Sequence, residues 1–330
     1  MSDWIIRPFR KEDEEIWDRF VQEGSINGTF LQEWRFLNYH PHARFYDCSL
    51  MIFYKEQLSA VIPACETEDE GKKTFFSHKG STYGGPVLSK KIYNASEIME
   101  LINELECFLR GQGFEKCVLK PTMSLLCSEG MDLLEYCLCS QGYHEYKELE
   151  LYIDYEKFHK DVMPNLSHMK QRIVKKCIKE GIQVKELVSN AEIDDFHTML
   201  SQNLEKFGTK PIHTTEELLN LKNQRLPEEI AFFGAYLNEK LVAGTMVFHF
   251  FRSRCAHTQY LAADLTFNQL SPLSYIYYDM ARRYQDLGYR YLSWGITSEH
   301  LGTQLNMGLT RNKESFGSVY MINHIYAKNL

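Results

Sequence analysis

Apolar and polar residues alternate in two similar stretches of the chain. The first, SLMIFYKEQLSAVIPAC at 49–65, has two β-rich runs on either side of Lys55-Glu56-Gln57. The second, AFFGAYLNEKLVAGTMVFHF at 231–250, has the same form about Asn238-Glu239-Lys240. Such runs, separated by a short polar turn, predict β-hairpins. A further strand-like run follows each hairpin, at 73–79 and at 255–263.

Each of these stretches leads to an amphipathic helix that ends at a glycine before another strand. The two segments are ASEIMELINELECFLRGQGFEKCVLKP at 95–121 and SPLSYIYYDMARRYQDLGYRYLSWG at 271–295. Gly113 and Gly288 fit the residue just after a helix, which favours positive φ. These glycines lie 175 residues apart, and the hairpin turns at Gln57 and Lys240 lie 183 apart. The similar offsets indicate one structural unit used twice.

Both units also begin with a strand followed by helices, WIIRPF at 4–9 and IQVKELV at 182–188. In the second unit Thr214 and Glu217 have the spacing of a capping box. The order strand, helices, hairpin, strand, helix, strand predicts an α/β fold (an α+β mixed sheet) with an antiparallel hairpin and a parallel crossover. We expect the boundary in the polar segment 155–168, which gives domains at 1–160 and 161–330.

Composition narrows the class of protein. A chain of 330 residues, 44% hydrophobic and 25% charged, is long enough for two globular domains. Its apolar runs fall short of the ~20 residues of a membrane span, and MSDWIIRPFRKEDEE becomes charged too early for a secretory leader. We therefore expect a cytoplasmic protein without integral membrane association. The formal charge of −7 argues against general nucleic-acid binding but permits a local basic groove.

The nine cysteines are odd in number and lack a Cys-x-x-Cys pair. Most lie in apolar segments, where cysteine behaves as a small hydrophobic residue. We expect reduced cysteines and neither a disulfide framework nor a metal site.

Five strings, in their order along the chain, carry a resemblance to a known family. They are GTFLQEWRFLNYHPHARFYDCSLMIFYKEQLSAVIPA (28–64), STYGGPVL (81–88), KQRIVKKCIKEGIQV (170–184), KFGTKPIH (206–213) and GLTRNKESFG (308–317). With these strings the chain resembles the tandem GNAT acyltransferases of the Fem-like (FemABX-related) type, which include peptidoglycan-bridge aminoacyl transferases and acyltransferases of bacterial polysaccharide pathways. Asn312 stands where the family pattern has phenylalanine. The resemblance implies two tandem GNAT-like domains, the first degenerate and on the acceptor side, the second with the transferase site.

The resemblance places the reaction beside YLSWG and the stretch that follows it. Lys313 takes the position of the family's lysine, which faces the reacting carbonyl. A cation there stabilises the oxyanion that forms when an amine attacks a thioester or an aminoacyl ester. The alternative is that Lys313 is a solvated charge between Arg311 and Glu314.

Transfer to an amine also needs a group that removes a proton. Asp264 is the first candidate, and Glu299 or His300 are the others, because each follows a predicted strand of the second unit. Tyr260 is a candidate proton donor to the leaving group. As alternatives, Asp264 caps a turn, His300 is a surface loop residue and Tyr260 packs in the core.

The expected donor is an acyl-CoA such as acetyl-CoA, used as co-substrate, because the chain is acidic. Common acetyl-CoA users have a glycine-rich loop before the central helix, but FNQLSPLSYIY at 267–277 contains no glycine. Ser271 as N-cap and Pro272 at the first position still predict a well-formed helix start. The predicted donor-binding residues are Leu270, Ser271, Leu273 and Ser274. Aminoacyl-tRNA is the second candidate donor.

Acceptor-binding residues are also implied by the resemblance. Lys170 and Arg172 would hold the diphosphate of a nucleotide-linked acceptor or a tRNA backbone. Tyr83, Gly84 and Gly85 would allow close approach to an acceptor, and His213 would face the cleft. Alternatively, the two basic residues lie on a solvated helix face, the glycines make a tight turn, and the histidine packs beside a helix cap.

Taken together, the sequence predicts an N-acyltransferase. An amine of a polysaccharide or cell-envelope precursor, presented by a small molecule or a nucleotide-linked sugar or peptide, would attack the donor directly. We expect neither a covalent enzyme intermediate nor a metal. The alternatives are an aminoacyl-tRNA-dependent transferase of the peptidoglycan-bridge type and a non-catalytic tandem repeat that binds an envelope precursor.

Overall fold

The computed structural model describes residues 3–40, 44–206 and 208–330. Residues 41–43 of the string at 28–64, and residue 207 of the string at 206–213, lie outside this description. The chain forms two compact units by its contacts. Unit 1 comprises Met1–Glu148, His300–Thr303 and Asn323–Leu330, and unit 2 comprises Leu149–Glu299 and Gln304–Ile322.

The chain passes between the units inside the strands β9 (His144–Asp154) and β17 (Val319–Asn329), and again on either side of the short segment His300–Thr303. The division therefore falls earlier than the predicted segment 155–168, and the end of the chain belongs to unit 1. A division inside a strand has no run of Pro, Gly or polar residues to mark it, which explains why the sequence pattern pointed elsewhere.

Both predicted hairpins are confirmed. In unit 1, β3 (Leu50–Tyr54) and β4 (Gln57–Ile62) pair antiparallel, and in unit 2 β11 (Ile230–Leu237) and β12 (Lys240–Phe250) do the same. Each turn has two residues with positive φ, at 47° and 64° in Lys55-Glu56 and at 48° and 65° in Asn238-Glu239. Positive φ at both central residues is the geometry of a type I′ turn, whose twist matches that of the strands.

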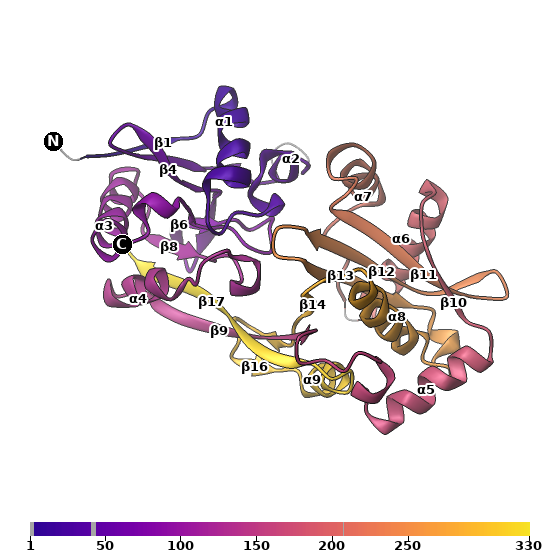
Figure 1. Ribbon diagram of the computed structural model, residues 1–330. Coiled ribbons are helices and arrows are strands. Elements are labelled where there is room, and N and C mark those ends of the chain that lie inside the picture. The colour runs from indigo at the N-terminus through magenta and orange to yellow at the C-terminus, as the bar shows by residue number, and fades with distance from the viewer. Residues whose placement is uncertain (1–2, 41–43, 207) are drawn as a thin grey trace. The chain divides into compact units, whose positions relative to one another are not determined.

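Unit 1 contains two separate sheet portions (Figure 1). One has the order β1-β3-β4-β7, and the other joins β2, β5, β6, β8 and the end of β17. The chain leaves the first portion after β4, at Pro63, and starts β5 two residues later. The remaining elements of unit 1 are β1 (Trp4–Pro8), η1 (Lys11–Asp13), α1 (Glu14–Arg19), η2 (Phe20–Gly24), η3 (Phe30–Gln32), α2 (Trp34–Leu37), β2 (Tyr46–Asp47), β5 (Cys65–Asp69), β6 (Lys72–Ser77), β7 (Val87–Leu88), η4 (Lys90–Ile92), α3 (Ala95–Gly111), β8 (Lys116–Leu119), η5 (Ser124–Leu126) and α4 (Asp132–Ser140).

Unit 2 has one continuous sheet of order β10-β11-β12-β13-β14-β9. Its strands are antiparallel except for β13 and β14, which are parallel and joined through α8, as the predicted crossover requires. The remaining elements are η6 (Met163–Asn165), α5 (His168–Lys179), β10 (Gln183–Glu186), α6 (Asn190–Glu205), α7 (Thr215–Asn220), η7 (Leu221–Arg225), β13 (Cys255–Ala263), η8 (Leu265–Phe267), α8 (Pro272–Asp286), β14 (Tyr291–Ile296), β15 (Ser298–Glu299), β16 (Gln304–Leu305) and α9 (Met307–Glu314).

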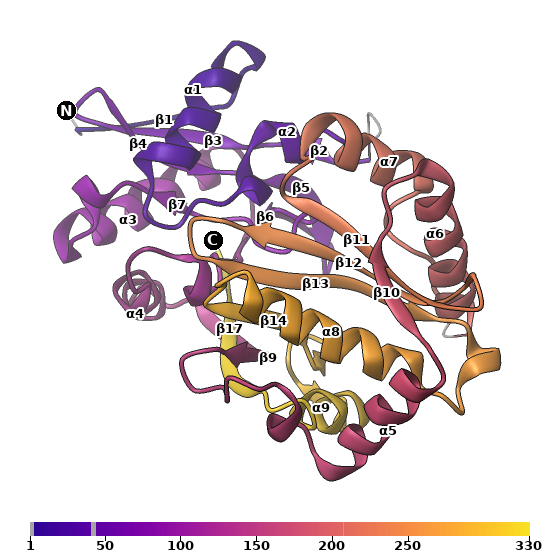
Figure 2. The ribbon, with the colours of Figure 1, turned by 45° about the vertical axis from the view of Figure 1, so that its right-hand side comes forward.

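Helices cover both faces of this sheet (Figure 2). Phe196 of α6 packs against Phe232, with ring centroids 5.8 Å apart. The guanidinium of Arg283 of α8 lies over the ring of Phe233, 4.8 Å from its centroid. Neighbouring residues of a strand point to opposite faces, so α6 and α8 lie on opposite sides of β11. Each unit buries its own apolar core.

Local signals placed the helix ends correctly. Gly113 and Gly288 follow α3 and α8 with φ of +77° and +73°, and Thr214 and Glu217 form the predicted capping box at α7. Ser271 is a correction: its φ is +52° and its side chain makes no capping bond, although Pro272 does begin α8. Because Ser271 is left-handed, and not in the extended conformation usual for an N-cap, its hydroxyl does not accept from the first-turn amides. It contacts the Ser274 hydroxyl at 2.9 Å instead.

Candidate functional site

The parallel strands β13 and β14 separate at their carboxyl ends. Three residue pairs join them, and His257 with Ser293 is the last. Beyond that pair β13 continues to Ala263 and β14 to Ile296 without further pairing between them in the described residues. Carboxyl ends of parallel strands in an α/β sheet are where ligands commonly bind. This opening is therefore the place where the candidate residues need to be located.

A β-bulge brings two polar side chains of β13 to one face of the sheet. Met246 and Phe248 are two apart on β12 and point to the same face. Their partners on β13 are Tyr260 and His257, which are three apart because the register shifts between them. His257 and Tyr260 therefore share a face, which an unbroken strand would not allow. Bulges commonly redirect side chains beside functional sites.

Three buried polar side chains from three strands meet at the opening. The Ser293 hydroxyl donates a short hydrogen bond to Oε1 of Glu150 on β9. His257 Nδ1 lies 2.6 Å from the same hydroxyl and 3.9 Å from Glu150 Oε1. Their exposed fractions are 0% for Ser293, 1% for Glu150 and 7% for His257. We call this set the Glu150–Ser293–His257 relay.

Lys313 of α9 lies beside the relay. Its ammonium donates to the carbonyl oxygens of Gly295 at 2.8 Å and Ile296 at 2.9 Å, and the side chain is 3% exposed. Within the part of the chain that the structure describes, its third N–H has no acceptor. Burial lowers the pKa of Lys313 to about 8, a shift that the Glu150 carboxylate opposes. The side chain is thus not a solvated surface charge.

Gly295 joins the lysine to the relay. Its N–H donates to the Ser293 hydroxyl at 3.2 Å, while its carbonyl accepts from Lys313. Its φ is +83°, a region that favours glycine. A Cβ at this position would lie 3.7 Å from His257 Cε1 and 3.8 Å from Lys313 Nζ. The missing side chain therefore leaves open the space between the imidazole edge and the ammonium.

Lys170 of α5 is a second buried ammonium. Its Nζ donates to the Ser274 hydroxyl at 2.9 Å and to Asn312 Oδ1 at 2.7 Å, and it lies 5.0 Å from the centroid of the Phe316 ring. Burial lowers the pKa of Lys170. Asn312, which departs from the family pattern, therefore has a partner that phenylalanine could not bind. The Lys170 ammonium lies beside the first turn of α8, at the positive end of the dipole of that helix. An anion bound between the two would relieve this repulsion.

Arg172 does not join Lys170. The two residues are two positions apart on α5 and point in different directions, so Lys170 is buried while Arg172 is exposed. Arg172, Lys175 and Lys179 make no ion pair within the described residues, and with Lys176 they give α5 an exposed basic face.

Tyr260 and His213 lie together, although the sequence suggested different roles for them. His213 Nδ1 is 2.5 Å from the Tyr260 hydroxyl. Burial raises the pKa of Tyr260. His213 also lines a cavity of about 530 Å³ between the end of α6 and the start of α7, together with His197 and Lys210.

Asp264 is engaged at the start of η8. Its Oδ1 accepts from the amide of Thr266 at 2.9 Å, and its Oδ2 lies 2.8 Å from Lys240 Nζ. The hydrogen bond from Lys240 is the main reason that the pKa of Asp264 is lowered to about 2. This is the environment of a capping carboxylate, because both of its oxygens are already engaged, one by the Thr266 amide and the other by Lys240.

The other predicted residues have local surroundings of their own. Glu299 is exposed and accepts from Asn306 at 2.9 Å, and the neighbouring His300 is exposed with a φ of +52°. In unit 1, Tyr83 is 2% exposed and its hydroxyl contacts Met123 Sδ at 3.4 Å. A Cβ on Gly84 would lie 2.0 Å from the backbone of Ser77. Gly84 is therefore required by close packing against the end of β6.

The four predicted donor-binding residues surround the start of α8. Leu270 and Leu273 pack against the core of unit 2, and the Leu270 carbonyl accepts from Cys177 Sγ at 3.1 Å. Ser271 and Ser274 lie next to Lys170. Together with the Leu273 amide these groups fit a phosphate-bearing donor better than an uncharged one. Among the described residues, no group of three or more His, Cys, Asp or Glu could hold a metal ion.

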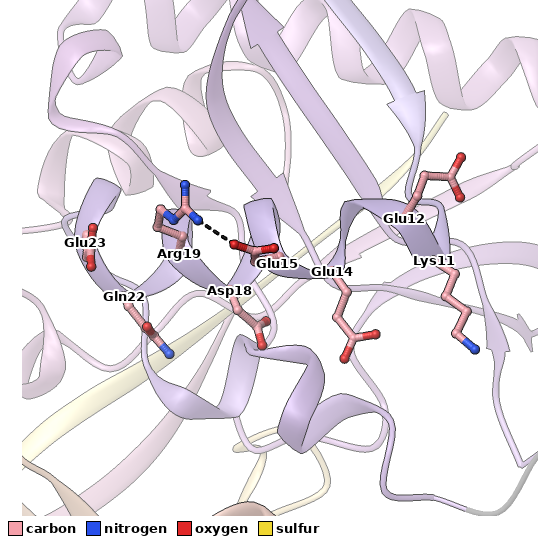
Figure 3. Close-up of a pocket in the computed structure, with 8 residues that line it drawn as sticks. All are labelled: Lys11, Glu12, Glu14, Glu15, Asp18, Arg19, Gln22 and Glu23. Atoms are coloured by element: carbon pink, nitrogen blue, oxygen red, sulfur yellow. Dashed lines mark hydrogen bonds and ion pairs between the residues drawn. The ribbon is translucent and has the colours of Figure 1, made fainter.

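Unit 1 has an acidic surface cavity of about 580 Å³ (Figure 3). Burial raises the pKa of Asp18 there to about 6, and Asp18 accepts from the Trp34 amide at 2.7 Å. None of the residues predicted as a site lies in it. The lining side chains are Lys11, Glu12, Glu14, Glu15, Asp18, Arg19, Gln22 and Glu23.

Sequence analysis missed Glu150, Ser293, His257 and Asn312 as a group. Ser293 is a single polar residue in the strand YLSWGI, whereas Glu150 and His257 lie in strands that hold other polar residues, and Asn312 is a departure from a motif. Such positions are informative because a buried polar group needs a partner, but the partners lie on strands far apart in sequence.

Comparison with known proteins agrees with this architecture. Residues 168–301 match the family model described as "Acetyltransferase (GNAT) domain". No curated protein sequence matches the chain. None of the described helices is long and apolar enough to cross a membrane.

Solved structures match nearly the whole chain at low identity. FemX superposes with a TM-score of 0.70 at 11% identity, covering 99% of this chain and 97% of that one. L-PGS from Bacillus licheniformis gives 0.62 at 12%, with coverages of 96% and 91%. A tandem GNAT protein from the clavulanic acid biosynthesis pathway gives 0.57 at 8%, with coverages of 99% and 98%. The predicted fold of two tandem GNAT-like domains is therefore confirmed, and FemX is among the solved structures that share it.

Proposed function

We propose that this chain is an N-acyltransferase working at the opening between β13 and β14. Residues 168–301 match the GNAT acetyltransferase domain model, and the chain shares its fold with FemX. The observation that carries this proposal is the buried ammonium of Lys313 on the Gly295 and Ile296 carbonyls, directly beyond the last β13–β14 pair.

The reaction is direct attack by an amine on an activated carbonyl. As the nitrogen adds to the carbonyl carbon, negative charge moves to the carbonyl oxygen. Lys313 has one N–H left to donate and lies in a site of low water content, where a fixed cation stabilises such an oxyanion strongly. With a pKa of about 8, the lysine is mostly protonated near neutral pH and can serve this role.

We infer that the donor carries a phosphate near the start of α8. Lys170, Ser271, Ser274 and the Leu273 amide of that helix would hold it. An acyl-CoA is the first candidate because this cation and helix start replace the missing glycine loop. The acceptor is an amine, and amines of polysaccharide or cell-envelope precursors are the class that the family resemblance favours.

Aminoacyl-tRNA is the second candidate donor, favoured by a different observation. The exposed basic face of α5 has side chains without acidic partners among the described residues, which is a surface suited to a nucleic-acid backbone. Binding of tRNA there would weaken steeply with salt and with reversal of the Arg172 and Lys175 charges. Binding that is insensitive to both would exclude this donor.

Ligand binding is the first test of the donor. The protein is titrated with acetyl-CoA, desulfo-CoA and bulk aminoacyl-tRNA while its melting temperature is followed. A ligand at 100 times its Kd stabilises the folded state by about 2.7 kcal/mol, which is readily visible. Stabilisation by the CoA compounds identifies the first donor class, and stabilisation by tRNA alone identifies the second.

Transfer is then measured with the donor that binds and a panel of amino sugars, nucleotide-linked amino sugars and peptides. Lys313→Met should lower kcat by ~100-fold or more, as removal of an oxyanion donor does. The matched control is Lys328→Met in unit 1, because Lys328 also donates to a backbone carbonyl, at 2.6 Å, but pairs with Glu106. Equal effects of the two substitutions on transfer would remove Lys313 from the mechanism.

A further inference from the structure

The mechanism above leaves the proton of the attacking amine without an acceptor, and the relay beside Lys313 has no assigned task. Ser293 has one hydrogen to donate and two lone pairs. Three groups contact its oxygen: Glu150 Oε1, His257 Nδ1 at 2.6 Å and the Gly295 N–H at 3.2 Å. The hydroxyl therefore donates one hydrogen bond and accepts two.

Counting hydrogens fixes the state of His257. The Gly295 amide can only donate, and an ionised Glu150 can only accept, so the serine hydrogen points to Glu150. The Ser293 oxygen must then accept from His257, which places the imidazole proton on Nδ1. In a neutral ring this leaves the lone pair on Nε2. No hydrogen bond occupies His257 Nε2 within the described residues.

The charged groups around His257 support a neutral ring. Burial and then the charge of Lys313 on α9 lower the pKa of His257 to about 4. Glu150 on β9 lies 3.9 Å from Nδ1, and a negative charge there favours the protonated ring. Phe248 on β12 stacks against the ring and adds no charge. The imidazole is therefore an uncharged base at neutral pH.

Resting on the proposed function, we propose that His257 is the general base of the acyl transfer, with its Nε2 held unprotonated by Glu150 acting through Ser293. His257 would be the catalytic residue, because it meets the amine, and Ser293 and Glu150 would be positioning residues. The open space beside Gly295, between the imidazole edge and Lys313, is where the reacting carbon and nitrogen would lie.

The proton and bond balance is complete with the two substrates alone. The amine nitrogen bonds to the carbonyl carbon, and one proton moves from that nitrogen to His257 Nε2 while Lys313 faces the new oxyanion. The negative oxyanion offsets the lysine charge, so His257 binds a proton more readily at that moment than in the resting site. The carbonyl re-forms, the bond to the thiol or alcohol breaks, and the leaving group takes the proton from Nε2.

Protonation of the ring can be measured without any substrate. Nitrogen-15 NMR of histidine-labelled protein distinguishes protonated from bare ring nitrogens, and the signal absent in His257→Asn identifies His257. We expect Nδ1–H and a bare Nε2. His197 is the matched control with the opposite tautomer, because its Nε2 donates to the His213 carbonyl at 2.8 Å. A proton on Nε2 of His257, or a charged ring at neutral pH, would overturn the proposal.

Glu150→Gln tests the coupling through Ser293. The side-chain amide introduced by this substitution would donate to Ser293, whose hydrogen would turn to His257 Nδ1 and drive the imidazole proton to Nε2. We expect the tautomer to reverse, and the rate of transfer to fall by ~100-fold or more, the usual range for loss of a general base. A fold defect would instead leave no His257 signal typical of a buried ring, and an unchanged tautomer would contradict the coupling.

Single-turnover kinetics distinguish a failure of the base assignment from a failure of the proposed acyltransferase function. His257→Gln keeps an amide near Nε2 without a base, and should lower single-turnover transfer by ~100-fold while the donor still raises the melting temperature as before. Unchanged transfer by His257→Gln would overturn the base assignment and leave the acyltransferase proposal standing. Absence of transfer by the unmodified protein with every donor and amine would overturn both.

Discussion

The two units have the same arrangement of strands, but equivalent positions in it hold polar residues in unit 2 and apolar residues in unit 1. In unit 2, His257 pairs with Ser293 across parallel strands, and Ser293 pairs with Tyr152 across antiparallel ones. In unit 1, Phe76 pairs with Val118 and Val118 with Ala327 in the same two senses. Val118 and Ser293 lie 175 residues apart, the same offset as the helix-ending glycines.

The equivalence between the two units also holds two residues further along the strands β9 and β17. Glu150 precedes Tyr152 by two positions, and Ile325 precedes Ala327 by two. The relay of unit 2 therefore corresponds to Phe76, Val118 and Ile325, which form an apolar cluster in unit 1.

This difference shows that the fold itself does not need the polar set. Unit 1 forms the same strand pairs with apolar residues, and packing these residues removes no polar side-chain group from water. Burying a carboxylate, an imidazole and an ammonium costs free energy that apolar packing would avoid. Their presence in only one of the two equivalent places supports a chemical role for unit 2 and a non-catalytic role for the same place in unit 1.

The strongest test of this comparison replaces the polar set of unit 2 with apolar residues like those of unit 1. We expect the variant Glu150→Ile, Ser293→Val, His257→Phe, Lys313→Met to fold with a melting temperature at or above that of the unmodified protein. Replacing a whole buried polar network with apolar residues is often neutral or stabilising. Transfer should fall by at least ~1,000-fold, because both the oxyanion cation and the base are lost.

Glu150→Ile alone is the control for that experiment. It should lower the melting temperature, because the buried Ser293 hydroxyl loses its acceptor and Lys313 loses a negative charge that favours its protonated form. An unsatisfied buried polar group alone costs about 1–3 kcal/mol. If the fourfold variant were the less stable of the two, the polar set would be part of the fold rather than a cost to it.

Gly295→Ala should give the next largest effect. The residue has a φ of +83°, so alanine costs about 1–2 kcal/mol of stability, and its methyl group would fill the space between His257 and Lys313. We expect transfer to fall by ~10-fold or more. Gly288→Ala is the matched control, since its φ is +73° and its Cβ would meet nothing within 4 Å. It should lose similar stability in thermal melts and keep its transfer rate.

The pH dependence should sharpen the role of Lys313. Only the protonated lysine stabilises the oxyanion, so kcat/KM should be maximal below a pKa of about 8 and fall as pH rises through it. Glu150→Gln removes the carboxylate that raises this pKa and should move the alkaline limb to lower pH. The limb is read from initial rates between pH 6 and pH 10. A limb that stays in place in Glu150→Gln belongs to another group.

Much of the fold was readable in the sequence because its signals are local. Turns with positive φ, glycines after helices and the capping box at Thr214 each depend on a few neighbouring residues. Lys313 was predicted as a site residue through its place in a motif of ten residues. The left-handed conformation of Ser271 was not predicted, because the local preference of serine before a proline pointed to a cap.

The relay was not predictable in the same way. Glu150, His257 and Ser293 are separated by more than 30 residues from one another and meet only through the strand register. In the sequence each is a polar residue inside a strand, with nothing to mark it as part of a site. Phe76, Val118 and Ile325 show that the equivalent strands of unit 1 form without such polar residues. The sequence pattern favoured Asp264 as base because it follows a strand, but position along the chain does not show that a carboxylate is already paired with a lysine.

Asp264→Ala should have the smallest effect on transfer and decides between the two candidate bases. The hydrogen bond from Lys240 keeps the pKa of Asp264 at about 2, so at neutral pH the carboxylate is ionised and occupied. Its stabilising effect is present above its unfolded pKa near 4 and is lost as pH falls through about 2. Removing a cap and a half-exposed ion pair should cost about 1 kcal/mol and change transfer by less than ~2-fold. A loss of transfer of ~100-fold in a variant with normal melting would instead make Asp264 the base and return His257 to a structural role.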